Sequence, residues 1–131
     1  TLKVRKNIIP GIFFIYATYQ EVQCFQSMYD FLGFATYRLN GRRLIMKVPA
    51  NEMNNFISFV DNCNSEINFF RPDEITLEKG TKVRLTGGDM DGVECYLTRF
   101  KGKRKKILAV SIPSLGTFTT VFVQPDFVEI I

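Results

Sequence analysis

The fold of the second half of this chain is decided by the stretch Glu78-Lys-Gly-Thr-Lys-Val-Arg-Leu-Thr-Gly-Gly-Asp-Met-Asp-Gly-Val-Glu-Cys-Tyr-Leu-Thr-Arg-Phe100. Val83 and Leu85 alternate with charged or hydroxyl-bearing neighbours, and residues 93–97 repeat the alternation. An apolar side chain at every second position indicates a half-buried strand, because successive side chains point to opposite faces. The stretch therefore predicts two strands joined by a turn.

Three glycines lie between the two alternating runs. Gly87 and Gly88 end the first run, and Gly92 stands just before the second. Glycine adopts positive φ at little cost and lets another backbone segment approach closely. We therefore expect these three residues to form the turn.

The rest of the second half continues the strand pattern. Five strands are expected within residues 78–131, at 81–86, 93–100, 105–112, 117–123 and 127–130. Short strands in close succession favour a small closed barrel, because closure removes exposed sheet edges. We predict an all-β barrel for this half.

The first half begins with an apolar run. Residues 12–16 are continuously β-branched or aromatic, which predicts a strand covered on both faces. Thr18, with Glu21 three positions later, predicts a capping box at the start of a helix. Apolar spacing carries this helix from 19 to 32, where Gly33 ends it.

A hairpin and a second helix are expected next. The pair Asn40-Gly41 favours a two-residue turn between strands at 35–39 and 43–48. Pro49 then starts a helix whose apolar stripe falls at i, i+3, i+4 and i+7: Met53, Phe56, Ile57 and Val60. Phe59 lies off this stripe, and we expect it to be partly exposed or, as a lesser alternative, to contact a partner.

The organisation predicted is an α+β first domain in residues 1–62, a polar linker in 63–77 and the β barrel in 78–131. We expect the first domain to be incomplete in this sequence of 131 residues, which starts at Thr1 in an alternating segment. An incomplete sheet has an open edge, so an edge-paired or swapped dimer is one expectation.

Composition restricts the chemistry. The chain has three cysteines, no histidine and no Cys-x-x-Cys pair, which argues against a zinc site and against Ser-His-Asp or Cys-His catalysis. We therefore expect no enzyme activity, no metal and no cofactor, and reduced thiols in a cytoplasmic protein. The apolar run at residues 8–17 is shorter than the roughly 20 residues that a membrane helix needs.

The net charge of +4 is concentrated in the second half, where residues 78–131 hold nine Lys or Arg and six Asp or Glu. Residues 101–106 contribute five of these basic groups: Lys101, Lys103, Arg104, Lys105 and Lys106. Such a cluster at a hairpin tip could contact phosphates of RNA or DNA, or could simply be a solvated turn. Arg42 and Arg43, beside the Asn40-Gly41 turn, form a weaker second candidate.

The second half resembles the KOW domain of the NusG family of transcription elongation and antitermination factors, an SH3-like barrel. The resemblance lies in residues 80–88, in Asp91-Gly-Val93, in residues 99–103 and in Asp126-Phe-Val-Glu129. Gly87, Gly88 and Gly92 correspond to the KOW turn.

The first half resembles the later part of the NGN domain, the other module of this family. Residues 9–15 stand where the family has a Pro-Gly-aromatic strand, and the helix, hairpin and helix follow in the family's order. Residues 110–115 and the aromatic content look most like the UpxY-type antiterminators of gut Bacteroides, which promote transcription of capsular polysaccharide operons.

The resemblance implies a binding factor. In the family, the NGN domain binds RNA polymerase through an apolar pocket and suppresses pausing or termination. The residues implied at this contact are Ile9, Pro10, Ile12 and Phe14, although core packing is an alternative role for each. The KOW domain implies a ribosomal or termination-factor partner. The alternative function is an RNA-binding KOW protein that acts on ribosomal or leader RNA.

Overall fold

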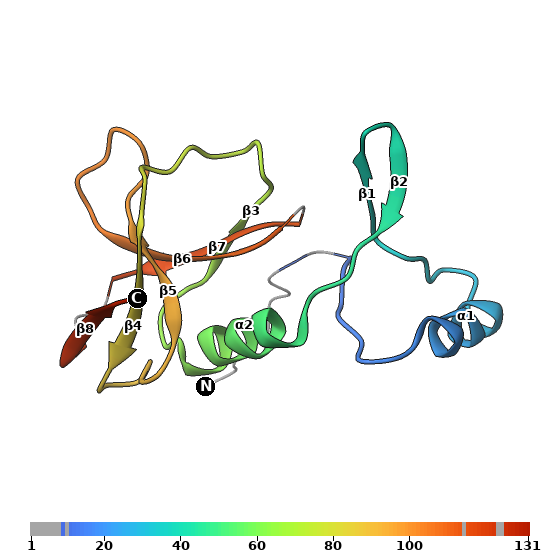
Figure 1. Ribbon diagram of the computed structural model, residues 1–131, viewed down its shortest axis with the longest axis horizontal. Helices are drawn as coiled ribbons and strands as arrows, with labels where there is room; N and C mark the ends of the chain where they lie inside the picture. The colour runs from blue at the N-terminus through green and yellow to red at the C-terminus, as the bar shows by residue number, and fades with distance from the viewer. Residues whose placement is uncertain (1–8, 10, 114, 123–124) are drawn as a thin grey trace, which may run out of the picture. The chain divides into compact units, whose positions relative to one another are not determined.

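The structure is a computed structural model that describes residues 9, 11–113, 115–122 and 125–131. Within these ranges the chain is an α+β protein with two helices and antiparallel strands (Figure 1). Its contacts divide it into two compact units, Thr1–Lys47 and Val48–Ile131. The α+β class that the sequence predicts is therefore confirmed.

The first unit contains helix α1, which spans Tyr19–Met28. Thr18 is its N-cap: the Glu21 backbone N–H donates to the Thr18 Oγ1 at 3.2 Å, and the hydroxyl donates to the Glu21 carboxylate at 3.0 Å. The predicted pairing of these two side chains at the helix start is therefore confirmed. The helix ends earlier than expected, because Tyr29 takes an extended backbone with φ −134°.

The hairpin of the first unit follows the sequence prediction closely. Strand β1 (Thr36–Leu39) pairs with β2 (Arg42–Ile45), and Leu39 lies opposite Arg42. Asn40 and Gly41 between them have φ of 51° and 77°. Positive φ at both central residues is what a type I′ turn requires, and asparagine and glycine are the residues that tolerate it best.

The strand predicted at residues 12–16 is wrong: the structure has no strand there, and four of the five side chains are exposed. Phe13 is 66% exposed and Tyr16 is fully exposed. A strand needs a neighbour for its backbone hydrogen bonds. In the described part of this unit the only strands, β1 and β2, pair solely with each other.

The second unit combines helix α2 (Ala50–Asn62), which begins after Pro49 as predicted, with one six-stranded antiparallel sheet. The strands are β3 (Asn68–Phe70), β4 (Thr81–Thr86), β5 (Glu94–Thr98), β6 (Ile107–Ile112), β7 (Gly116–Val121) and β8 (Phe127–Ile130). Their order across the sheet is β3-β7-β6-β5-β4-β8 (Figure 1).

Each of the five strands predicted in residues 78–131 has a counterpart in this sheet. The predicted closure is not observed, because β3 and β8 each have one neighbour and form open edges within the described residues. The sequence pattern does not indicate β3, which lies in the stretch that the sequence predicts as a linker. Strand β3 forms because it pairs with β7, with Phe69 opposite Phe118.

Helix α2 packs against this sheet. The Phe56 ring lies 4.5 Å from that of Phe118, measured between centroids, and Phe118 lies 4.9 Å from Phe69. The Asn55 amide donates to the Glu94 carbonyl at 2.7 Å and accepts from the Glu94 N–H at 3.1 Å. The helix before residues 63–77 therefore belongs to the same compact unit as the strands that follow them.

The expectation that Phe59 is exposed is wrong. Phe59 is fully buried, whereas Ile57, which belongs to the predicted stripe, is 45% exposed. The buried face of α2 runs through Phe56 and Phe59 and is rotated away from Ile57. The stripe was inferred from apolar residues alone, but Asn55 must also face the sheet to reach Glu94.

Replacing Phe59 by alanine is expected to destabilise the second unit by about 3–5 kcal/mol, because truncating a buried aromatic leaves a cavity. The matched control is Ile57→Ala on the same helix, which should change the free energy of unfolding by about 0.5 kcal/mol or less because the side chain is exposed. Urea denaturation followed by circular dichroism measures both. Equal losses for the two variants would contradict the observed helix orientation.

Candidate functional site

The glycine turn between β4 and β5 has the backbone that its sequence predicts. Gly87, Gly88 and Gly92 have φ of +78°, +74° and +81°. The Gly87 N–H donates to the Asp91 carboxylate at 2.8 Å, and the Gly92 N–H donates to the Leu85 carbonyl at 2.7 Å. The turn is therefore held by its own hydrogen bonds.

This turn offers little to a partner. Met90, the one residue of the turn with an apolar side chain, is only 8% exposed and packs inward. Asp89 accepts a hydrogen bond from the Asn64 amide at 2.6 Å. The described geometry therefore gives the turn a structural role, which is to connect β4 and β5.

Residues 101–106, termed here the basic loop, connect β5 to β6, and all six are exposed. The base of the loop is anchored: Lys101 N–H donates to the Thr76 carbonyl at 3.0 Å, and Phe100 forms a β-bridge with Leu77. Gly102, with φ +81°, makes the turn. Among the described residues no carboxylate forms an ion pair with the loop, so its positive charge is not neutralised by the protein.

A groove of about 320 Å³ adjoins the basic loop on the sheet surface. We call it the β3–β7 groove; its lining includes Asn68, Phe100, Lys103, Lys105, Ile107 and Val121. Phe100 packs edge-on against Phe70 with ring centroids 5.7 Å apart. Sequence reasoning identified the two lysines and missed the others, because the groove exists only once β3 is paired with β7.

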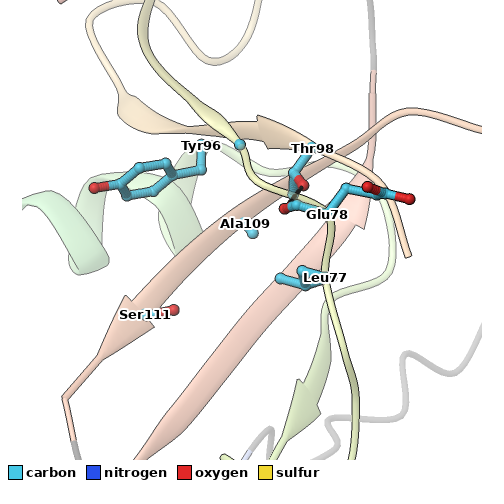
Figure 2. A pocket seen from close by; sticks show the side chains of 7 residues that line it. Leu77, Glu78, Tyr96, Thr98, Ala109 and Ser111 are labelled. Atoms are coloured by element: carbon cyan, nitrogen blue, oxygen red, sulfur yellow. Dashed lines mark hydrogen bonds between the residues drawn. The ribbon is translucent and has the colours of Figure 1, made fainter. Parts of the chain in front are cut away.

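A second, smaller hollow of about 230 Å³ lies over β5 and β6 (Figure 2). Figure 2 shows Tyr96 and Glu78 at opposite sides of it, with Ala109 and Ser111 along β6. The Thr98 hydroxyl donates to the Glu78 carbonyl at 2.7 Å. Its lining contains an acidic residue and no basic one, which disfavours an anionic ligand.

Arg84 forms ion pairs with two carboxylates. It lies 2.8 Å from Glu94 on β5 and 3.4 Å from Glu129 on β8, so it connects three adjacent strands. The hydrogen bond and charge of Glu94, with a smaller contribution from Glu129, raise the pKa of Arg84. This cation has a structural role within the sheet and is not available to a ligand.

The residues that the resemblance assigns to polymerase contact lie in the first unit, in a segment without regular structure. Ile9 is buried, Ile12 is half-buried and Phe14 is 38% exposed; Pro10 lies outside the described residues. Arg42 and Arg43 are exposed on β2, in a different unit from the basic loop.

The first unit exposes many large apolar side chains. Helix α1 has no buried residue. The large apolar side chains exposed between residues 11 and 31 are Phe13, Phe14, Ile15, Tyr16, Tyr19, Phe25, Met28, Tyr29 and Phe31. We call this set the aromatic surface. Large exposed apolar patches mark interaction sites in soluble proteins.

Comparisons with known proteins add no relative: no family model, no curated protein and no solved structure matches the chain. Neither helix in the described part of the chain combines the length and apolar character that crossing a membrane would take.

The Cys95 thiol provides a pH-dependent test of the core. Burial raises its pKa from 9.0 to about 12. The unfolded thiol loses its proton near its ordinary pKa and the folded one does not, so this contribution to stability is complete below about pH 9 and is lost as the pH rises toward 12. Urea denaturation at pH 8 to 11 should therefore show a decline in stability.

The variant Cys95→Ala should show a smaller decline over this range, because it lacks the buried thiol. The matched control is Cys24→Ala, which removes an exposed thiol and should retain the decline of the unmodified protein. Identical pH profiles for the two variants would contradict a buried, protonated Cys95.

Proposed function

We propose that this chain is a transcription elongation and antitermination factor of the NusG type, a binding protein that contacts RNA polymerase through its first unit. The observation that carries the proposal is the aromatic surface. Residues 13–16 and α1 expose aromatic side chains within and after residues 9–15, the segment that resembles the polymerase-binding strand of the family.

The physical argument is that the first unit leaves apolar side chains exposed that a partner could bury. Burying a large apolar side chain contributes about 1.5–3 kcal/mol, and the first unit leaves many such side chains in water. A partner that covers this surface gains that free energy. Recognition of a helical tip by an apolar surface is a common way to use it.

The second unit supports the same proposal through the order of its parts. A glycine turn with positive φ joins the first two strands of the stretch that resembles a KOW domain. In this proposal the second unit is the KOW-like module, the protein acts in the cytoplasm, and the operons it serves include those for capsular polysaccharide.

Binding to bacterial RNA polymerase is tested by a pull-down with purified core enzyme at low and high salt. Apolar contacts are weakly screened by ions, so we expect retention of the chain in high salt. Ile12→Asp places a charge in the proposed contact, and we expect it to reduce retention at least tenfold.

The matched control is Ile57→Asp, which makes the same change at an exposed position of α2. This control should bind like the unmodified chain. Retention that disappears in high salt, or equal behaviour of the two variants, would count against an apolar contact made by the first unit. The activity itself is measured as readthrough of a terminator by purified polymerase.

A further inference from the structure

The β3–β7 groove and the basic loop belong to the second unit, whereas the aromatic surface belongs to the first. Lys103 and Lys105 line the groove, and no acidic side chain does. Neither lysine forms an ion pair with a described residue. A ligand that enters this groove therefore meets the unneutralised positive charge of these two lysines.

The groove also has an apolar part. Phe100 is half-buried and lines it together with Ile107 and the strand partner of Ile107, Val121, which is 38% exposed. Phe100 is held in place by the edge contact with Phe70 and by the bridge to Leu77. A fixed aromatic ring in a groove is a surface on which a flat apolar group can stack at little entropic cost.

A polar group completes the lining. The Asn68 side chain is exposed, and among the described residues it makes no hydrogen bond. Register places Asn68 opposite Thr119, which also lines the groove. An amide offers both donors and an acceptor, as hydrogen bonding to the edge of a base requires.

We propose that the β3–β7 groove binds a short segment of single-stranded nucleic acid. The phosphates contact Lys103 and Lys105, one base stacks on Phe100, and Asn68 bonds to the edge of that base. Cationic side chains combined with an aromatic platform are the usual means of holding single strands. An acidic peptide would match the lysines but leave the aromatic platform unused.

The size of the groove favours one base over a duplex. Its volume of about 320 Å³ is at the lower end of the range for small-ligand pockets, about 300–1,000 Å³. In a duplex the bases are stacked and paired, so none is free to enter. This site does not depend on the proposed polymerase contact and is tested without polymerase.

The experiment is fluorescence anisotropy of the full chain with labelled 12-nucleotide oligouridylate and oligothymidylate. Single strands lose affinity with a slope of about −0.7 per phosphate contact in a log–log salt plot. For two to five contacts, we expect affinity to fall about 7- to 130-fold between 50 and 200 mM salt. Tighter binding of one oligonucleotide assigns the natural ligand as RNA or DNA.

Two kinds of variant test separately the positive charge of the groove and its apolar lining. Lys103→Ala combined with Lys105→Ala should weaken binding and reduce the salt slope by about 1.4. Phe100→Ala should weaken binding about 5- to 150-fold, the range for loss of one stacked base. Because Phe100 packs on Phe70, Val121→Glu is a second variant: it adds a negative charge at a partly exposed position in the groove and should also weaken binding.

The matched control is Lys79→Ala combined with Lys82→Ala, which removes the same charge from exposed positions outside the groove. It should weaken binding less than threefold. Equal effects of the two double variants, or unchanged affinity in Phe100→Ala and Val121→Glu, would overturn the groove as the site. Binding of labelled polyglutamate in place of both oligonucleotides would overturn nucleic acid as the ligand.

Discussion

The packing of Phe118 is the contact on which the second unit depends. This fully buried ring on β7 lies between Phe56 of α2 and Phe69 of β3, so one side chain attaches both a helix and an edge strand to the sheet. Successive residues of a strand point to opposite faces, so seating Phe69 against Phe118 turns Phe70 to the other face, where it meets Phe100. The core contact thus sets the position of the groove on the outer surface.

Local patterns in the sequence predicted local structure well. The Thr18–Glu21 cap and the Asn40-Gly41 turn depend on neighbours a few positions away, and the structure contains both. The strands of the second half are marked by their own alternation, although β4 also pairs with the distant β8. The failures depend on distant partners. Residues 12–16 have the composition of a buried strand but no neighbouring strand in the described part of the first unit, and β3 forms only because β7 is available to pair with it.

The same distinction applies to the candidate site. The run of lysines and arginine in residues 101–106 is visible in the sequence, because charge is a local property. No pattern in the sequence indicates Asn68 or Val121, because they become neighbours of the loop only when β3, β7 and β6 lie side by side. Phe100 was within reach of prediction, as an aromatic residue directly before a basic run.

Asn55 has a further consequence for how the sheet behaves in a crowded solution. Its amide occupies both backbone groups of Glu94, two positions before Tyr96 begins the pairing of β5 with β6. The side chain thus continues the hydrogen-bond ladder at a residue where β6 does not pair with β5, and an extended peptide from another molecule finds no free N–H or carbonyl there. Of the strands in this six-stranded sheet, only β3 and β8 then remain open to growth of the sheet, and β8 carries the exposed apolar side chains of Phe127 and Ile130.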